Sequence, residues 1–239
     1  MVIYEPKGKA REYAPLAANL YKGCAHGCLY CYAPGATLTA PAVFHGQPCP
    51  RRDVLRQLQA DAVKFRGDKR RVLLSFTSDP YQPLERETCL TRAALEILAS
   101  AHIKVAVLTK GCLLAQRDFD ILSNMDAEFA VTLTSDDDAE SKRWEPKAAL
   151  PADRIESLRA AKRWGIPTWV SFEPVINPGA VLRLIDATAA FVDFYKVGKL
   201  NHHPFAQTID WPAFRQAVCA KLDAVGKPYL IKKDLLEAR

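Results

Sequence analysis

Three cysteines lie within one short segment of the chain, at a spacing of C-x3-C-x2-C. Cys24, Cys28 and Cys31 occupy the run KGCAHGCLYCY at residues 22–32. A loop this short can bring three thiolates around one metal centre, and soft sulfur ligands favour iron-sulfur clusters or zinc. A closed cubane takes four protein ligands, so three thiolates suit a 4Fe-4S cluster with one iron left open. The spacing therefore predicts an iron-sulfur site with a free coordination position.

Two other interpretations of these cysteines stay open. A structural zinc site needs a fourth ligand, which His26 would have to supply from inside the same loop. Alternatively, the three thiols are unrelated core or surface residues. The total of seven cysteines is odd, which argues against a secreted disulfide framework and for metal or redox chemistry in a reducing compartment. The other four cysteines are isolated and are expected to act as small apolar residues: Cys49, Cys89, Cys112 and Cys219.

The elements that must position the cysteines alternate in type along the chain. Short β-branched or aromatic runs are each followed by a segment with helical spacing of apolar residues, which is typical of βα units. Strands are expected at 72–76, 104–108, 129–133, 168–172 and 191–197, with an earlier one within 16–21. Helices are expected at 53–65, 87–101, 116–123, 151–164, 178–189 and 211–225. The strands are apolar enough to be buried on both faces, as parallel strands are.

Six such units in succession favour an α/β fold that curls into a full or partial (β/α)6 barrel of the TIM-like kind. In such barrels the site lies at the carboxyl ends of the strands. Polar residues do follow the expected strands, at 77–81, 109–111, 134–138, 173–174 and 198–203. Because loops are often polar in any case, this pattern supports a site without naming its chemistry.

Composition points to one domain without a membrane anchor. No repeat, low-complexity segment or flexible linker divides residues 1–239. We expect the cysteine loop at 22–33, the barrel to about residue 200, and a C-terminal helix and tail at 210–239. No apolar run of membrane-spanning length exists, and charged residues occupy the N-terminus, so a cytoplasmic protein is expected. The net charge of +6 permits nucleic acid as a partner without requiring it.

The cysteine run resembles the signature of the radical S-adenosylmethionine (SAM) superfamily, in which an aromatic residue directly precedes the third cysteine. The resemblance implies that Cys24, Cys28 and Cys31 bind a 4Fe-4S cluster and that SAM occupies the open iron. It further implies that an electron from the cluster cleaves SAM to methionine and a 5′-deoxyadenosyl radical, which abstracts hydrogen from a substrate. A reductant such as flavodoxin or ferredoxin would then be a partner. The family fold is a full or partial βα barrel, in agreement with the alternation of elements.

Further motifs resemble the spore photoproduct lyase-like branch, also called DNA repair photolyase-like. They include SFTSDPYQP at 75–83, the pair Thr109-Lys110, and the run 197–201. The branch makes a nucleic acid or nucleotide substrate an expectation. In these lyases, however, a hydrogen-donor cysteine stands directly before the Thr-Ser-Asp of the second strand end. This chain has Phe76 there, and a phenyl ring cannot donate hydrogen as a thiol does. Thymine-dimer repair by the lyase route is therefore not expected.

The resemblance also implies roles toward SAM for several side chains. Tyr30 would pack near the adenine, and Lys110 would face the carboxylate. Hydroxyl and acidic groups at the second strand end would accept hydrogen bonds from the ammonium: Ser75, Thr77, Ser78 and Asp79. Thr132 and Thr134 would bond the ribose, and Arg154 would either reach the carboxylate or pair with Glu145. The alternative function is a non-catalytic iron-sulfur or zinc-binding protein that retains the barrel.

Overall fold

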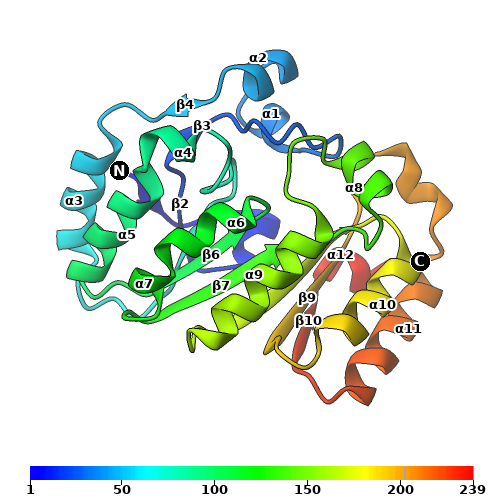
Figure 1. The fold of residues 1–239 in the computed structure, drawn as a ribbon. Coiled ribbons are helices and arrows are strands. Elements are labelled where there is room, and N and C mark those ends of the chain that lie inside the picture. The colour runs from blue at the N-terminus through cyan, green and yellow to red at the C-terminus, as the bar shows by residue number, and fades with distance from the viewer. Residues whose placement is uncertain (202, 239) are drawn as a thin grey trace.

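The computed structural model describes residues 1–201 and 203–238. Its centre is an eight-stranded sheet with the order β1-β2-β5-β6-β7-β8-β9-β10 (Figure 1). All neighbours from β2 to β10 are parallel, and only β1 is antiparallel to its neighbour. The strands are β1 (Ile3–Tyr4), β2 (Leu16–Ala18), β5 (Val72–Leu74), β6 (Val105–Thr109), β7 (Ala127–Thr132), β8 (Thr168–Val175), β9 (Phe194–Lys199) and β10 (Tyr229–Ile231).

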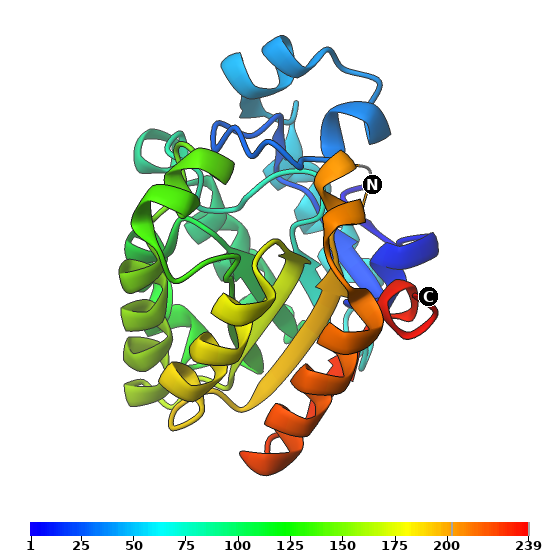
Figure 2. The ribbon, with the colours of Figure 1, turned by 90° about the vertical axis from the view of Figure 1, so that its right-hand side faces the viewer.

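Helices cover the outer face of this curved sheet (Figures 1 and 2). The long ones are α3 (Val54–Lys64), α5 (Leu90–Ser100), α9 (Pro151–Arg163), α10 (Pro178–Thr188) and α11 (Trp211–Ala224). The last three carry proline in their first turn, where its missing N–H costs nothing. The Asn177 side chain caps α10 through the Ala180 amide at 3.1 Å, and Asp210 caps α11 through the Ala213 amide at 3.0 Å.

The two faces of each strand bury side chains of different size, because successive side chains point to opposite faces. Val105 and Val107 of β6 pack in the outer core with the helices, whereas Ala106 between them belongs to a separate inner layer. The inner layer consists mainly of alanines around one tryptophan: Ala14, Ala17, Leu73, Ala106, Ala130 and Trp169. Small inner residues allow the sheet to curl toward this face. The result is the expected partial barrel, which stays open between β1 and β10.

Shorter elements complete the fold. The structure contains η1 (Gly8–Glu12), β3 (Tyr21–Lys22), α1 (Ala33–Ala36), α2 (Pro41–Gly46), β4 (Cys49–Pro50), α4 (Glu85–Thr88), α6 (Cys112–Ala115), η2 (Gln116–Asp118), α7 (Phe119–Leu122), α8 (Asp138–Trp144), η3 (Pro204–Thr208) and α12 (Lys233–Leu236). In Figure 1, α1, α2 and α8 lie beyond the same end of the sheet. None of the described helices is long and apolar enough to span a bilayer.

The sequence predictions hold for the six principal strands and for most helices, with three corrections. The expected helix at 116–123 is divided into the 3-10 helix η2 and the short helix α7. The expected helix at 87–101 is broken into α4 and α5, because Cys89 has a positive φ of 47° and interrupts the helical hydrogen bonding. The sheet also does not end near residue 200, since β10 pairs in parallel with β9 and places Tyr229 beside Tyr195. The strand β10 has only three residues and is surrounded by polar residues, so its apolar pattern is too short to predict a strand from the sequence.

Candidate active site

One cavity of about 410 Å³ opens at the carboxyl ends of the strands. Most of the side chains that the sequence analysis assigned to cofactors line it: Cys24, Cys28, Tyr30, Cys31, Ser75, Thr77, Ser78, Asp79, Lys110 and Thr132. Thr134 and Arg154 are not part of the lining. Residue 202 of the polar run 198–203 lies outside the described residues.

The cysteine loop is held by backbone bonds to two neighbouring helices. The Cys24 amide donates to Phe44 O of α2 at 3.0 Å, and the Leu29 amide donates to Trp144 O of α8 at 2.9 Å. Gly23 makes this approach possible, because a Cβ there would lie 2.4 Å from Phe44 O and its φ is +76°. The backbone is thereby anchored on the outside, and the three thiols line the cavity.

The environment of the thiols fits an iron-sulfur cluster better than a single zinc ion. Burial raises the pKa of Cys28 to about 12, and the pKa values of Cys24 and Cys31 are also raised by burial. Such dry thiols lose their protons only to a strongly bound cation. Among the described residues, no three His, Cys, Asp or Glu side chains converge as one ion requires. A single zinc needs all its sulfurs about 2.3 Å from one point, whereas a cubane distributes its ligands over separate irons.

His26 does not serve as a fourth ligand in this arrangement. The residue is only 2 % exposed. Nδ1 lies 3.1 Å from Lys147 O, and Nε2 lies 3.3 Å from a carboxylate oxygen of Asp79. Nδ1 is therefore engaged by Lys147 O, whereas Nε2 faces Asp79 without forming a hydrogen bond within the described residues. The histidine instead links the cysteine loop to the turn that follows β5.

Asp79 is placed in the site but is not a free acceptor. Its oxygens accept hydrogen bonds from the Thr109 hydroxyl at 2.6 Å, the Lys110 amide at 2.7 Å and the Tyr81 amide at 2.8 Å. Burial alone would raise its pKa, but the charge of His26 and these hydrogen bonds outweigh burial and lower the pKa to about 2. We conclude that Asp79 joins the turns after β5 and β6 and positions Lys110.

The serines beside Asp79 have unused hydrogen-bonding capacity. The hydroxyls of Ser75 and Ser78 are buried in the cavity wall and have no partner within the described structure. The Thr134 hydroxyl near the end of β7 is also buried without a partner there, although Thr134 does not line the cavity. Buried polar groups are nearly always hydrogen-bonded, so unpartnered hydroxyls in a cavity indicate a polar ligand. Asn19 orients this strand end, because its Oδ1 accepts from the amides of Phe76 at 2.9 Å and Thr77 at 3.0 Å.

Lys110 brings a positive charge into the cavity without forming an ion pair within the described residues. Its Nζ lies 5.8 Å from the centre of the Tyr30 ring. Burial would lower its pKa, but the charges that Cys28, Glu145 and Asp79 carry when deprotonated outweigh burial and raise it. The lysine is therefore charged at neutral pH and available to an anionic group of a ligand.

Arg154 takes the structural role rather than the ligand-binding one. Its guanidinium pairs with Glu145 at 2.5 Å and donates to Thr132 O at 2.9 Å and Ala149 O at 2.8 Å. Tyr30 also donates its hydroxyl to Glu145. Of the two expectations for Arg154, the structure shows the pairing with Glu145, and two carbonyls accept from its other nitrogens. The pair fixes Tyr30 and the end of β7.

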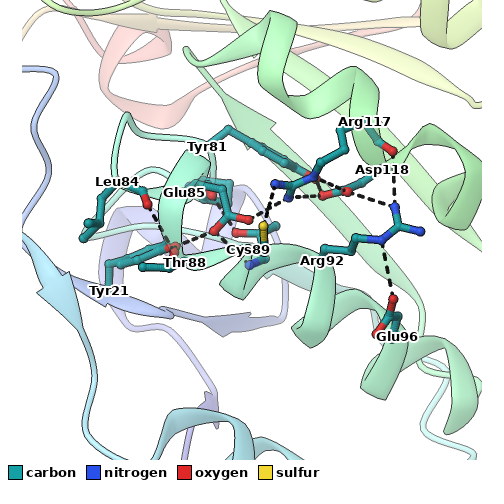
Figure 3. A network of polar contacts seen from close by, with 12 residues as sticks. Tyr21, Tyr81, Leu84, Glu85, Thr88, Cys89, Arg92, Glu96, Arg117 and Asp118 are labelled. Carbon is teal, nitrogen blue, oxygen red and sulfur yellow. Dashed lines mark hydrogen bonds and ion pairs between the residues drawn. The ribbon is translucent and has the colours of Figure 1, made fainter.

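A buried polar network supports the turns around Asp79 and Lys110 (Figure 3). Arg117 binds Glu85 at 2.7 Å and Asp118 at 2.7 Å, and the Tyr81 hydroxyl donates to Asp118 at 3.0 Å. Tyr21, in β3 just before the cysteine loop, donates to Glu85. The network thus ties together the segments that carry the cysteines and Asp79.

A second group of residues lines the cavity. Glu173 and Lys199 are expected from the sequence only as polar residues that follow strands, and Tyr13 and Lys232 are not expected there. Tyr13 donates its hydroxyl to Glu173 and shares a 2.7 Å bond with the Ser171 hydroxyl. Lys232 binds both oxygens of Glu173, at 2.9 and 2.7 Å. Gly198 makes room for this carboxylate, because a Cβ there would lie 2.7 Å from the Glu173 carboxyl carbon. Tyr13, Glu173 and Lys232 all line the cavity, together with Lys199.

The family match agrees with this geometry. The sequence model of the Radical SAM superfamily matches residues 18–192, from the end of β2 to just past α10. The chain belongs to the radical SAM superfamily. Membership implies a 4Fe-4S cluster and SAM as cofactors, and the thiols, unpartnered serines and Lys110 provide residues suited to both.

The curated relatives are themselves uncharacterized. A protein of Methanocaldococcus jannaschii is 27% identical over 190 residues, covering 79% of this chain and 71% of its own length. A Mycobacterium tuberculosis protein is 26% identical over 172 residues, covering 66% of this chain, and the aligned part spans only 48% of that protein. A protein of Acidianus two-tailed virus is 29% identical over 175 residues, with 69% and 57% coverage.

Solved structures share the fold at low sequence identity. Spore photoproduct lyase complexed with dinucleoside spore photoproduct superposes with a TM-score of 0.72 at 14% identity, covering 95% of this chain and 78% of that one. SuiB of Streptococcus suis, solved bound to S-adenosylmethionine, superposes with a TM-score of 0.66 at 12% identity, covering 90% of this chain and 49% of that one. These similarities establish the partial barrel of this chain.

Proposed function

We propose that this chain is a radical SAM enzyme that binds one 4Fe-4S cluster through Cys24, Cys28 and Cys31 and that uses SAM to abstract hydrogen from a substrate. The observation that carries the proposal is the convergence of the three thiols with Lys110 and the unpartnered hydroxyls in one cavity. When bound, the cluster supplies the electron that cleaves SAM to methionine and the 5′-deoxyadenosyl radical. A non-catalytic metal protein would not need the additional polar groups.

The residues of the chain bind and orient SAM in this proposal. Lys110 faces the carboxylate as a charged donor, and the hydroxyls of Ser75 and Ser78 accept from the ammonium. Asp79 holds Lys110 in place through the amide bond at 2.7 Å. Tyr30 is fixed by Glu145 beside the thiols. Buried walls exclude water, which would otherwise compete for these donors.

The proposed substrate is a nucleic acid or nucleotide, and the proposed reaction is not thymine-dimer repair by the lyase route. The net charge of +6 and the branch motifs support the substrate class. Phe76 supports a reaction other than thymine-dimer repair, because it lines the cavity where the related lyases have a thiol. A flavodoxin or ferredoxin is the proposed reductant, since the cleavage of SAM consumes one electron.

Anaerobic reconstitution tests the proposal directly. The purified chain should turn brown, bind about four irons and four sulfides, and release 5′-deoxyadenosine from SAM after reduction. Replacing Cys24, Cys28 or Cys31 by Ala should abolish the cluster, whereas Cys49→Ala is the matched control on an exposed cysteine. Iron retained by the triple mutant, or zinc alone in the wild type, would refute the proposal.

A binding experiment tests the substrate class. If six or more basic residues contact phosphates, affinity for DNA or RNA should fall by orders of magnitude between about 50 and 200 mM salt. Binding that is absent or independent of salt would exclude nucleic acid. Efficient repair of dimer-containing DNA would contradict the proposal that the reaction is not thymine-dimer repair.

A further inference from the structure

The wall of the cavity formed by β8, β9 and β10 has an excess of positive charge that the SAM site does not use. Five lysines line the whole cavity, against the two carboxylates of Asp79 and Glu173: Lys7, Lys9, Lys110, Lys199 and Lys232. Lys110 belongs to the SAM site, and Lys9 pairs with Asp234. Three lysines therefore remain, Lys199 and Lys232 on this wall and Lys7 at the rim, with Glu173 as their lining counter-charge.

Lys232 is a buried cation that lines the cavity. The residue is 4 % exposed. Its Nζ binds both Glu173 oxygens and lies 4.5 Å from the centre of the Tyr13 ring. An ammonium group has three donors, so at least one hydrogen is left beyond the two bonds to Glu173. Tyr13 and Gly198 hold Glu173 in place, which makes Lys232 a rigid, preorganised donor.

Lys199 and Lys7 add charge that has no partner. Lys199 ends β9 and lies with its Nζ 5.4 Å from the centre of the Trp211 ring. Lys7 precedes η1 at the rim. Within residues 1–201 and 203–238, neither lysine forms an ion pair, in contrast to Lys9 and Lys232. An anion bound in the cavity would lower the electrostatic cost of placing these like charges around it.

We infer that Lys199 and Lys232, with Lys7 at the rim, form a subsite for an oxyanion of the substrate, either a phosphate ester or a carboxylate. The inference rests on the proposed function, because it assigns the substrate side of the same cavity. The lysines come from β9, the residue after β10 and the N-terminal segment, so the subsite is separate from the SAM groups on the cysteine loop, β5 and β6. It would orient the substrate by its charged group.

Calorimetric titration of the reconstituted chain, saturated with SAM, tests the subsite with inorganic phosphate as the probe. Lys199→Gln is the deciding variant, because this lysine has no ion pair to lose. Loss of one charge-assisted bond predicts affinity at least about ten-fold weaker. Lys232→Gln should weaken binding at least as much, with circular dichroism confirming its fold. Lys69→Gln, which removes an exposed lysine before β5, should bind like the wild type.

Two paired probes identify the oxyanion. If thymidine 5′-monophosphate binds more tightly than thymidine, the subsite binds phosphate. If succinate binds more tightly than succinamide, the subsite binds carboxylate. The inference is overturned if no anion binds, if Lys199→Gln binds like the wild type, or if only Lys110→Gln loses binding. Release of 5′-deoxyadenosine by the wild type without anion binding would refute the subsite alone. Anion binding without a cluster would refute the proposed function alone.

Discussion

At the scale of single residues, the site combines charged groups whose states are set by burial. Lys110 and Asp79 are distant in sequence and meet only through the fold, and the Asp79 carboxylate accepts from the Lys110 amide rather than from its ammonium. The ammonium therefore keeps its charge for a ligand. In the buried pair of Arg154 and Glu145, in contrast, the two charges neutralise each other. The pair influences the site by holding the Tyr30 hydroxyl in place.

Lys110→Ala should weaken SAM binding by roughly ten-fold to a hundred-fold, because a charge-assisted hydrogen bond in a partly dry site contributes about 1.5 to 3 kcal/mol. Equilibrium dialysis of SAM against the reconstituted protein measures the effect. Lys147→Ala is the control, since this lysine is exposed beyond α8. Equal affinity in wild type and Lys110→Ala would remove the residue from the SAM site.

Lys196 predicts a pH dependence of stability. Its Nζ donates to Tyr13 O at 2.8 Å and lies 4.3 Å from the centre of the Trp169 ring. Burial lowers its pKa from 10.5 to about 8, so the folded protein loses this proton earlier than the unfolded chain. Between pH 8 and 10.5 the unfolded state binds more protons, and the contribution of Lys196 to stability rises with pH.

Urea unfolding of wild type and Lys196→Met measures this linkage. The difference in unfolding free energy should shift in favour of the wild type above pH 8, by at most about 3 kcal/mol at roughly 1.36 kcal/mol per pKa unit. It should be constant from about pH 6 to 7. The exposed Lys69→Met should show no such shift, and a constant difference for Lys196→Met up to about pH 10 would contradict the lowered pKa.

At the scale of elements, the site depends on tight contacts between the turns that follow the strands. Gly111, after β6, lies against the Tyr81 backbone, while Tyr81 is itself held by Asp118 in the network of Figure 3. The same contact region contains the amide of Lys110 and the carboxylate of Asp79. Support from α4 and η2 is therefore transmitted to the two turns that line the cavity.

Gly111→Ala should destabilise the protein by about 1 to 3 kcal/mol, the usual cost of overpacking. The new Cβ would lie 1.9 Å from Tyr81 O, and a backbone atom in a bonded turn cannot move aside easily. Urea unfolding measures the loss, and SAM affinity should fall with it because Lys110 is adjacent. Gly46→Ala is the control, since nothing lies within 4 Å of its added Cβ; equal losses in both variants would contradict the packing argument.

At the scale of the whole molecule, the first and last segments meet across the open side of the barrel. Lys9 of η1 pairs with Asp234 of α12, and the Lys233 amide donates to Glu12 at 2.9 Å. Figure 2 shows both termini on this side. The contacts between η1 and α12 are partly exposed, whereas the central strands are buried on both faces, so stability should be unevenly distributed.

Amide hydrogen exchange should therefore be slowest in β6 and β7 and markedly faster in β1, β10 and α12. The central strands exchange through global unfolding, while an edge element opens by breaking only one row of hydrogen bonds. Mass spectrometry of peptic peptides resolves these elements. Equal protection of β7 and β10 would indicate that the open side is closed by contacts stronger than those described.

The cysteine chemistry and the main strands follow from the sequence because both are encoded locally. The three thiols share one loop, and each long parallel strand contains a cluster of apolar residues within a few positions, so neither needs knowledge of distant residues. The turn residues Ser75, Ser78 and Lys110 could be placed in the site for a similar reason. Carboxyl ends of parallel strands meet at one end of a barrel whatever their exact register.

The tertiary structure alone decided which polar groups are free to act. Whether Arg154 meets a ligand or Glu145, and whether Asp79 is open or engaged, depends on distances that no local pattern contains. Tyr13 and Glu173 are 160 positions apart, and Glu173 and Lys232 are 59 apart, so only the curl of the sheet brings them together. Small alanines on the inner face permit that curl. The second charged wall of the cavity therefore exists only in the folded molecule, because its residues come from segments that are far apart along the chain.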